Sequence, residues 1–263
     1  MIFPSGEGLK KFVKNSNEMK NILVYINPQK RLDNQSEILF KIQIDNSYEL
    51  GWKKEDILFI TNFDYEYNGI RSAVIGDEYY CDYSPISTKI SAIVGAFKQG
   101  LLKDDLYWLH DLDAFQSEAI TESEVNMDRW DMAICDFGRL MKWSGGSIFF
   151  KNTARDIFEK TNNLMYKKRL IDEQAMTEVS HNDEKIYNRI KKMNISYNLV
   201  PFNIRTCYKM AIKPLKVVHF NPFEGVRQLK IASALDFYKG NNKINTPLIS
   251  QRLLKIFERY GIS

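Results

Sequence analysis

The chain has 263 residues, 44% of them hydrophobic, which is enough for one substantial core, so we expect a single domain over residues 1–263. Its 37 basic and 33 acidic residues leave a net charge of +4 and are interspersed along the sequence, which argues against nucleic acid as a partner. Cys81, Cys135 and Cys207 lack the spacing of a disulfide framework or zinc site, and no leader-like segment or membrane-spanning apolar stretch is evident, so we expect a cytoplasmic protein with no membrane span.

The first expected strand and helix follow a polar, lysine-rich N-terminal segment. Residues 22–26 form a continuous apolar run that ends at Asn27, as in a strand buried on both faces. A helix is expected from Asn34, which can cap it together with Glu37, and Gly51 would end it. Apolar residues also alternate within this segment, so its sequence is compatible with a strand as well.

Two more strands and another helix are expected before residue 106. Residues 56–60, apolar from Ile57 onward, form a second strand that ends close to Asn62, and residues 73–75 form a weaker strand. The spacing of apolar residues across 90–101 predicts an amphipathic helix. Together with the apolar run 106–109, these segments give the order β-α-β-β-α-β, which is typical of a Rossmann-like half with a mostly parallel sheet.

Two carboxylates, Asp111 and Asp113, follow the apolar run 106–109 and His110. In parallel sheets, ligands bind outside the carboxyl ends of the strands. Carboxylates one residue apart present oxygen ligands to a hard divalent cation, magnesium or manganese, which commonly holds the phosphates of a nucleotide. The alternative is an aspartate pair in a turn or at a helix cap. We expect the flanking Trp108 and Phe115 to be core residues.

The second half of the sequence mixes strands and helices. Residues 131–135 are expected to form a strand, and a pair of glycines leads into another over residues 147–150. A helix is expected from about Thr153, with Asp156 as its capping partner, to the basic segment 167–169.

The last expected elements are short. A helix opens at 172–174, strand-like pieces occupy 198–201 and 215–219, and a final helix covers 245–261. The start, inward-facing positions and end of that final helix are expected at Thr246 and Pro247, at Leu253, Leu254 and Phe257, and at Gly261.

Four features then occur along the chain in one order. They are the D-x-D at 111–113, a Gly-Gly-Ser strand at 145–150, Asp-Glu-Gln at 172–174 and a strand that ends in His219. Together they resemble the nucleotide-sugar glycosyltransferases of the type A fold. The resemblance implies an α/β fold with a Rossmann-like, mixed and mostly parallel central sheet flanked by helices.

The resemblance also implies two halves and a reaction. Residues 21–115 would bind the nucleotide and residues 130–235 the acceptor. The protein would be a metal-dependent glycosyltransferase that moves a hexose or related sugar from a UDP- or GDP-sugar donor to a hydroxyl of a glycan or other acceptor. Mn²⁺ or Mg²⁺ would hold the donor diphosphate through the D-x-D.

Metal-binding roles follow from the resemblance. Asp113 would bind the metal directly, and Asp111 would contact it through water or hydrogen-bond the donor ribose. His219 would complete the metal shell, as in a subset of these enzymes, and an imidazole ligand favours manganese; the alternative is a structural histidine. The sequence departs from that subset's H-x-x-G-x-x-K-P-W signature after His219, where Arg227 would replace the lysine that meets the diphosphate.

Asp172 and Glu173 are the candidates for acid–base catalysis. An inverting transfer needs one carboxylate to take the proton of the acceptor hydroxyl. The alternative is favourable charge at a helix N-terminus. Gln174 keeps a retaining mechanism open, because in some retaining relatives an Asp-Gln pair at this point touches the donor sugar.

The remaining donor-site candidates are Asn27, Asn62, Lys89 and Gly146. The two asparagines end the first two strands, where a base and ribose would lie, and Lys89 would reach a phosphate or ribose. Gly146, with its neighbour Gly145, would let the backbone approach the donor sugar closely. A tight turn explains the glycines as well, and the other residues are compatible with turns and surface positions.

Three other functions use similar residues. A haloacid-dehalogenase-like phosphatase carries its D-x-D after the first strand, whereas three expected strands precede this one. A metal-dependent nucleotidyltransferase would usually show a glycine-rich phosphate loop after the first strand, and Asn27-Pro28-Gln29-Lys30 is not one. A non-catalytic nucleotide-sugar-binding module of the same fold is the third alternative.

Overall fold

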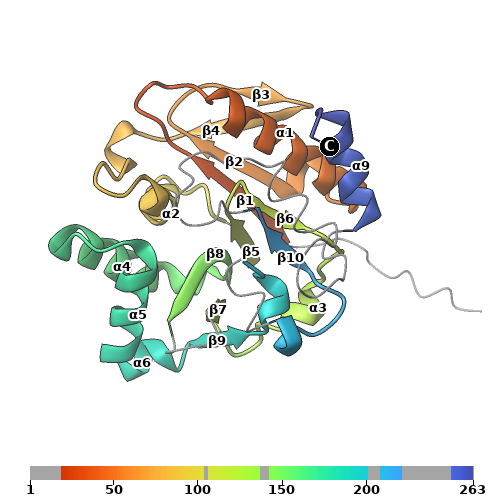
Figure 1. The fold of residues 1–263 in the computed structure, drawn as a ribbon. Coiled ribbons are helices and arrows are strands. Elements are labelled where there is room, and N and C mark those ends of the chain that lie inside the picture. Colours follow the sequence, from red (N-terminus) through yellow and green to blue (C-terminus); the bar gives the residue numbers. More distant parts are fainter. Residues whose placement is uncertain (1–18, 104–105, 137–141, 201–207, 221–249, 263) are drawn as a thin grey trace, which may run out of the picture.

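A computed structural model describes residues 19–103, 106–136, 142–200, 208–220 and 250–262 (Figure 1). Its strands are β1 (Met19–Tyr25), β2 (Ile57–Thr61), β3 (Glu66–Tyr67), β4 (Ile70–Val74), β5 (Leu106–His110), β6 (Ala114–Gln116), β7 (Met132–Asp136), β8 (Trp143–Phe150), β9 (Ile190–Met193) and β10 (Val217–His219). Its α-helices are α1 (Asn34–Glu49), α2 (Thr88–Lys98), α3 (Glu122–Val125), α4 (Arg155–Lys168), α5 (Asp172–Asn182), α6 (Glu184–Tyr187) and α9 (Gln251–Arg259).

Eight of the strands form one mixed sheet in the order β3-β4-β2-β1-β5-β8-β7-β9. Strand β1 is parallel to β2 and β5, and β2 is parallel to β4. Strand β8 runs antiparallel to both β5 and β7, and β9 returns parallel to β7. The expected β-α-β-β-α-β order is therefore confirmed, with the short β3 added at the edge. The mixed, mostly parallel sheet is confirmed as well.

Helices cover both faces of this sheet (Figure 1). One face packs against α2, α4 and α5 in a core that includes Ile93 of α2 and Phe158 of α4. The other face packs against α1, with Phe40 and Ile44 in its core. Beyond α1, the helix α9 and the two-stranded β6–β10 sheet form a further layer with its own cluster of apolar residues.

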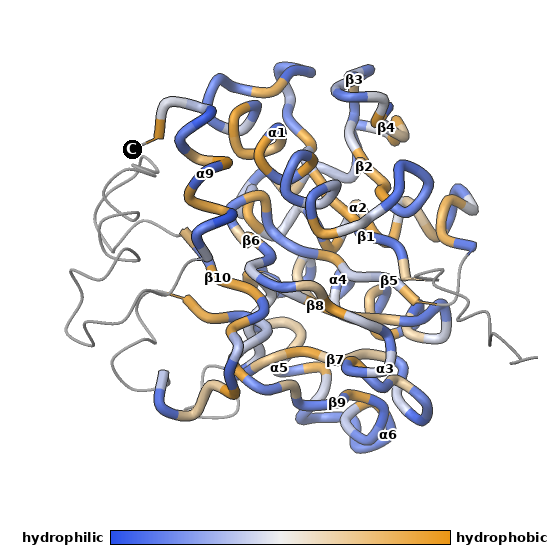
Figure 2. The backbone as a smooth tube through the Cα atoms, turned by 90° about the vertical axis from the view of Figure 1, so that its right-hand side faces the viewer, coloured by the Kyte–Doolittle hydropathy of each residue, from blue (hydrophilic) through white to orange (hydrophobic). Residues whose placement is uncertain are grey.

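Helix α1 resolves the ambiguity between helix and strand that its sequence presents. Phe40 and Ile44 face the sheet, while Leu39 and Ile42 belong to the cluster shared with α9. The helix is thus buried on two sides, so its apolar residues do not follow one stripe. Figure 2 shows hydrophobic and hydrophilic positions mixed along it. Its N-cap is Asp33 rather than the expected Asn34, because the Asp33 carboxylate accepts the N–H groups of the first turn.

Helix α4 begins two residues later than predicted. It starts at Arg155 after Ala154, with no side-chain cap from Thr153. Asp156 does not act as a capping partner, because its carboxylate takes a charged hydrogen bond from Arg189, at the turn into β9. A long-range ion pair has therefore replaced the local cap that the sequence pattern indicated.

Other expected elements occur with small changes. The two glycines at 145–146 lie inside β8 rather than in a turn before it. Of the expected strand-like piece 198–201, residues 198–200 are described, and among these only Leu199 makes an isolated bridge. Trp108 and Phe115 are fully buried, as predicted.

The final helix is described from Ser250 onward, and its expected start at Thr246 and Pro247 lies outside the described residues. Ser250 caps α9, and the three apolar positions expected to face inward are buried. Gly261 follows the helix with φ of 69°, in the left-handed region that suits glycine. No helix within the described ranges combines the length and the apolar character needed to cross a membrane.

Candidate metal and donor site

The two aspartates of the D-x-D lie in the tight turn 111–113 that joins β5 to β6. The N–H of Asp111 donates to the carbonyl of Gly146 in β8 at 3.1 Å, and Ala114 N–H closes the turn onto the carbonyl of Asp111 at 3.0 Å. Because β1 and β5 are parallel neighbours, with Leu23 opposite His110, this turn lies at the carboxyl edge of the sheet.

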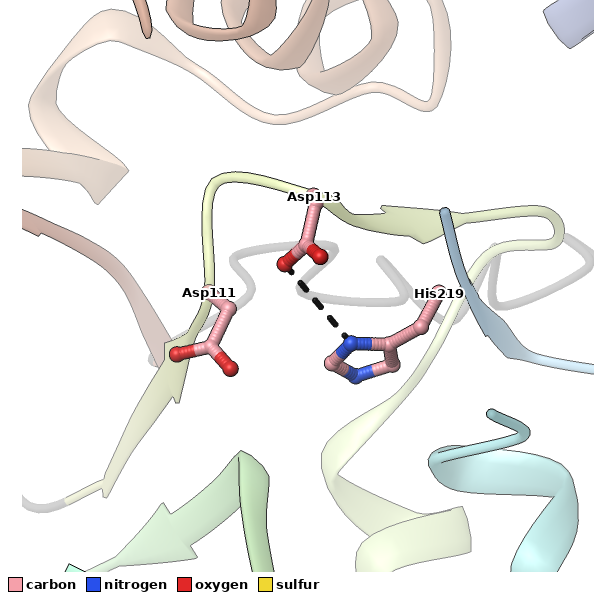
Figure 3. Close-up of side chains that lie close together, drawn as sticks. All are labelled: Asp111, Asp113 and His219. Carbon is pink, nitrogen blue, oxygen red and sulfur yellow. Dashed lines mark ion pairs between the residues drawn. The ribbon is translucent and has the colours of Figure 1, made fainter. Parts of the chain in front are cut away.

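Strand β10 brings His219 to the same turn from the far end of the sequence. It pairs antiparallel with β6, with His219 opposite Ala114, and the N–H of Phe220 donates to the carbonyl of Asp113 at 2.9 Å. Figure 3 shows Asp111, Asp113 and His219 around a common space. One ligand atom from each lies within 4.8 Å of the others, and His219 Nδ1 is 3.7 Å from Asp113 Oδ1.

A glycine at position 146 makes room for that histidine. A Cβ atom on Gly146 would lie 2.2 Å from His219 Cε1, well inside van der Waals contact. The imidazole is almost fully buried, so it has little space in which to move away. The glycine is therefore needed for a close approach to a side chain, and β8 continues through it without a turn.

The electrostatics of the three groups suit a divalent cation. Burial, together with the negative charge of Asp111, raises the pKa of Asp113 to about 7. Burial lowers the pKa of His219 to about 4, which keeps its imidazole neutral and able to donate a lone pair. Two carboxylates and a neutral imidazole are ligands that Mn²⁺ accepts, and a buried carboxyl with a raised pKa is one that a cation would ionise. The residues therefore fit a divalent metal.

Lys89 on α2 links the D-x-D turn to the start of α5. Its Nζ lies 2.6 Å from Asp111 Oδ1 and 3.4 Å from Asp172 Oδ2. Burial alone would lower the pKa of Lys89, but Asp111 and then Asp172 outweigh it and hold that pKa above its ordinary value. The ammonium group is therefore charged and shared by two carboxylates.

Asp172 and Glu173 start α5 and have different surroundings. The Asp172 carboxylate is buried, accepts a hydrogen bond from the Ser87 hydroxyl at 3.2 Å, and pairs with Lys89. Glu173 Oε1 accepts the N–H of Gly145 at 2.9 Å. Burial, and then the charge of Asp172, raise the pKa of Glu173 to about 7. Gln174, the next residue of α5, is exposed.

These groups surround one cleft of about 720 Å³. The predicted site residues that line it are Asn27, Lys89, Asp111, Asp113, Gly146, Asp172, Glu173 and His219. Gln174 and Asn62 are not among its lining residues, and Arg227 lies outside the described part of the chain.

The two asparagines bond to each other and to the loop around them. Asn27 N–H donates to Asn62 Oδ1 at 3.0 Å, and Asn62 Nδ2 donates to the carbonyl of Asn27 and to Asp77 Oδ1, each at 2.9 Å. These bonds join the ends of β1 and β2. Asn62 thus contributes by holding the loop that carries Asn27.

A group of residues at the end of the cleft near β1 was not predicted from the sequence. Tyr25, Asp33, Gln35 and Ser36 line it there, and the Tyr25 hydroxyl donates to Asp33 at 2.9 Å. They lie at the carboxyl end of β1 and in the first turn of α1. The signal that points to them is position: in a Rossmann-like half, the first strand–helix junction faces the ligand.

Comparison with solved structures finds the same architecture in glycosyltransferases. The galactosyltransferase LgtC, in complex with donor and acceptor sugar analogues, matches with a TM-score of 0.57 at 12% identity, over 83% of this chain and 94% of LgtC. The glycosyltransferase GlyE of Streptococcus pneumoniae matches with a TM-score of 0.56 at 10% identity, over 93% of this chain and 64% of GlyE. For the bifunctional glycosyltransferase WbbM, the TM-score is 0.51 at 10% identity, over 92% of this chain and 51% of WbbM.

The chain therefore has the fold of type A glycosyltransferases, as its motif order predicted. At these identities the likeness is one of fold. No protein-family model matches the sequence, and a comparison with curated proteins gives no match.

Proposed function

We propose that this protein is a metal-dependent glycosyltransferase that moves a sugar from a nucleoside-diphosphate-sugar to a hydroxyl acceptor. The observation that carries the proposal is the convergence of Asp111, Asp113 and His219 in one cleft at the carboxyl edge of the sheet. The fold supports it, since LgtC with donor and acceptor sugar analogues has the same architecture.

The proposed metal would be Mn²⁺ or Mg²⁺, held by Asp111, Asp113 and His219, and the imidazole favours Mn²⁺. When bound, it supplies positive charge where negative charge develops on the departing diphosphate. Lys89 holds the Asp111 carboxylate at 2.6 Å and so orients it toward the same space. In this proposal, UDP- or GDP-sugars are the donors and a glycan or similar hydroxyl compound is the acceptor.

We assign the proton transfer to Glu173 and a positioning role to Asp172. Asp172 is engaged by Lys89 and by Ser87, which leaves it poorly placed to take a proton from a substrate. Glu173 lines the cleft and has a pKa of about 7, which suits a group that accepts the proton of a hydroxyl near neutral pH. Gly145 N–H holds this carboxylate in place through Oε1.

The buried free thiols of Cys81 and Cys135 agree with the cytoplasmic location that we propose.

Thermal unfolding with nucleotides tests the proposal. We expect UDP or GDP to raise the melting temperature in the presence of Mn²⁺ and to have little effect without it, because the diphosphate needs the metal. Asp113→Asn should abolish the Mn²⁺-dependent rise, while Asp64→Asn, at an exposed position, should keep it. The absence of a response to any nucleotide would contradict the proposal, and pyrophosphate release from a nucleoside triphosphate would favour a nucleotidyltransferase.

A further inference from the structure

One buried glutamine on α1 reaches the D-x-D turn from the far side of the metal ligands. Gln43 is 1% exposed in a helix segment whose other buried side chains are mostly apolar. Its Nε2 donates to the carbonyl of Ala114 at 2.7 Å and to that of Leu112 at 3.0 Å, and it lies 3.5 Å from the carbonyl of Asp111.

The carbonyls of Leu112 and Ala114 belong to the residues directly before and after Asp113 in the chain. The carbonyl of Asp113 itself accepts the N–H of Phe220 next to His219. The backbone of Asp113 is therefore held from α1 on one side and from β10 on the other. Two tethers of this kind fix the direction in which the Asp113 carboxylate leaves the chain.

A buried amide costs free energy unless its donors are satisfied, and the carbonyls of a buried turn carry the same cost. The hydrogen bonds between the Gln43 amide and the turn satisfy both sets of buried polar groups and so remove this cost. An apolar residue at position 43 would leave the carbonyls of Leu112 and Ala114 without that donor. The turn would then be free to rotate its peptide groups toward other partners.

Asn46, next to Gln43 on the same helix face, makes a comparable contact farther from the metal ligands. Its Nδ2 donates to the carbonyl of Gln116 at 2.9 Å, and Arg252 of α9 bonds to its Oδ1. Gln43 and Asn46 are thus two buried amides on one helix that hold the same stretch of chain. Of these two amides, Gln43 is the one that bonds to the carbonyls on either side of Asp113.

We propose that Gln43 is a positioning residue for the metal site. Its amide group fixes the backbone around Asp113 so that the ligand atoms of Asp111, Asp113 and His219 meet within reach of one cation. The inference rests on the proposed function, because it presupposes that these three residues bind metal.

The test is a Mn²⁺ titration of the full chain, with free Mn²⁺ measured by electron paramagnetic resonance. Gln43→Met keeps the volume and removes both donors. We expect it to weaken Mn²⁺ binding by about 10- to 100-fold, the range found when outer-shell partners of metal ligands are removed. Asn46→Leu is the matched control. This variant should also lower the melting temperature. It should leave Mn²⁺ affinity within about threefold of the unmodified chain, because the partner of Asn46 is the carbonyl of Gln116, which is not next to a proposed metal ligand in the chain.

Equal Mn²⁺ affinity in Gln43→Met and the unmodified chain would overturn the inference. Equal weakening by Gln43→Met and Asn46→Leu would overturn it too, because the glutamine would then act only through general stability. Should Gln43→Met fail to fold, Gln43→Glu, which keeps the shape and retains one donor at most, is measured in its place. Unchanged Mn²⁺ affinity in that variant would overturn the inference equally.

Failure of the proposed function gives a different result. In that case the unmodified chain and Asp113→Asn would hold Mn²⁺ equally weakly, whatever stands at position 43. If the unmodified chain binds Mn²⁺ and Asp113→Asn does not, the metal site stands, and the Gln43→Met titration decides the role of the glutamine alone.

Discussion

The carboxyl group of Glu173 is largely buried and yet lines the cleft. Its folded-state pKa of about 7 lies above the ordinary value of 4.5, because burial and the neighbouring Asp172 disfavour its charge. At pH values between these two numbers, the folded chain keeps a proton that the unfolded chain has lost. The free energy of unfolding therefore decreases as the pH rises through this window, and Glu173 alone accounts for about 3 kcal/mol of that decrease.

We therefore expect Glu173→Gln to be more stabilising at pH 8 than at pH 4.5, by about 3 kcal/mol in the free energy of unfolding. Denaturant unfolding at the two pH values measures this difference. Glu178→Gln, on the same helix but partly exposed beside Lys168, should show no comparable change. If the pH dependence of Glu173→Gln parallels that of the unmodified chain, the carboxyl has an ordinary pKa and the case for it as the proton acceptor is lost.

The proposed metal site draws on two distant parts of the sequence, since Asp111 and Asp113 follow β5 and His219 ends β10. Asp111 and Asp113 could be predicted, because a buried apolar strand stops at them and local pattern is enough to show this. The pairing of β10 with β6 could not be predicted, because it depends on hydrogen bonds between distant parts of the sequence that the local spacing of residues does not indicate. The sequence indicated that His219 ends a strand, but the fold alone brings its Nδ1 to 3.7 Å from Asp113.

Charged side chains show the same limit of local reasoning. Lys89 could be assigned to the cleft from its helix position, but its sharing between Asp111 and Asp172 arises only where α2, β5 and α5 meet. The predicted helix caps were wrong for a related reason. Asn34 and Thr153 match the capping pattern, whereas Asp33 and a distant arginine supply the contacts that the structure uses.

Gly146 of β8 lies against His219 at the end of β10, so we expect Gly146→Ala to displace His219 first. The added methyl would lie 2.2 Å from the imidazole, and the ring must shift. We expect Mn²⁺ affinity to fall by about tenfold or more, with stability lowered by about 1–3 kcal/mol. A Mn²⁺ titration and thermal unfolding measure the two effects.

Gly76→Ala is the control for this change, because the atoms nearest to its methyl would be those of the flexible carboxylate end of Glu78. It should leave both quantities nearly unchanged. If Gly146→Ala binds Mn²⁺ as the unmodified chain does, His219 is not a metal ligand, and the site would consist of the two aspartates.

The two halves expected from the sequence share one sheet. Strand β5, at the end of the first expected half (residues 21–115), pairs over four residues with β8 of the second (residues 130–235). Helices α2 and α4, one from each half, pack in the same core. The alternation of strands and helices made this architecture predictable, because the spacing of apolar residues within each segment indicates whether it is a strand or a helix and which face is buried. We therefore propose that residues 1–263 form a single cooperative domain.

Phe257 of α9 tests this cooperativity from the C-terminal end of the chain. Its ring is fully buried and packs edge-on against Phe115 of β6 at 5.1 Å and Phe220, which follows His219 at the end of β10, at 4.9 Å. Phe257→Ala should lower the free energy of unfolding by about 3–5 kcal/mol. In a single domain, thermal unfolding should remain one transition that moves as a whole to lower temperature.

Ile212→Ala, at a residue 66% exposed, should shift that transition by no more than about 0.5 kcal/mol in stability. The contrary outcome for Phe257→Ala is a melt with two steps, of which one stays at the original temperature. That step would belong to a part of the sheet that folds without α9, and the halves would then be separate units despite the β5–β8 pairing.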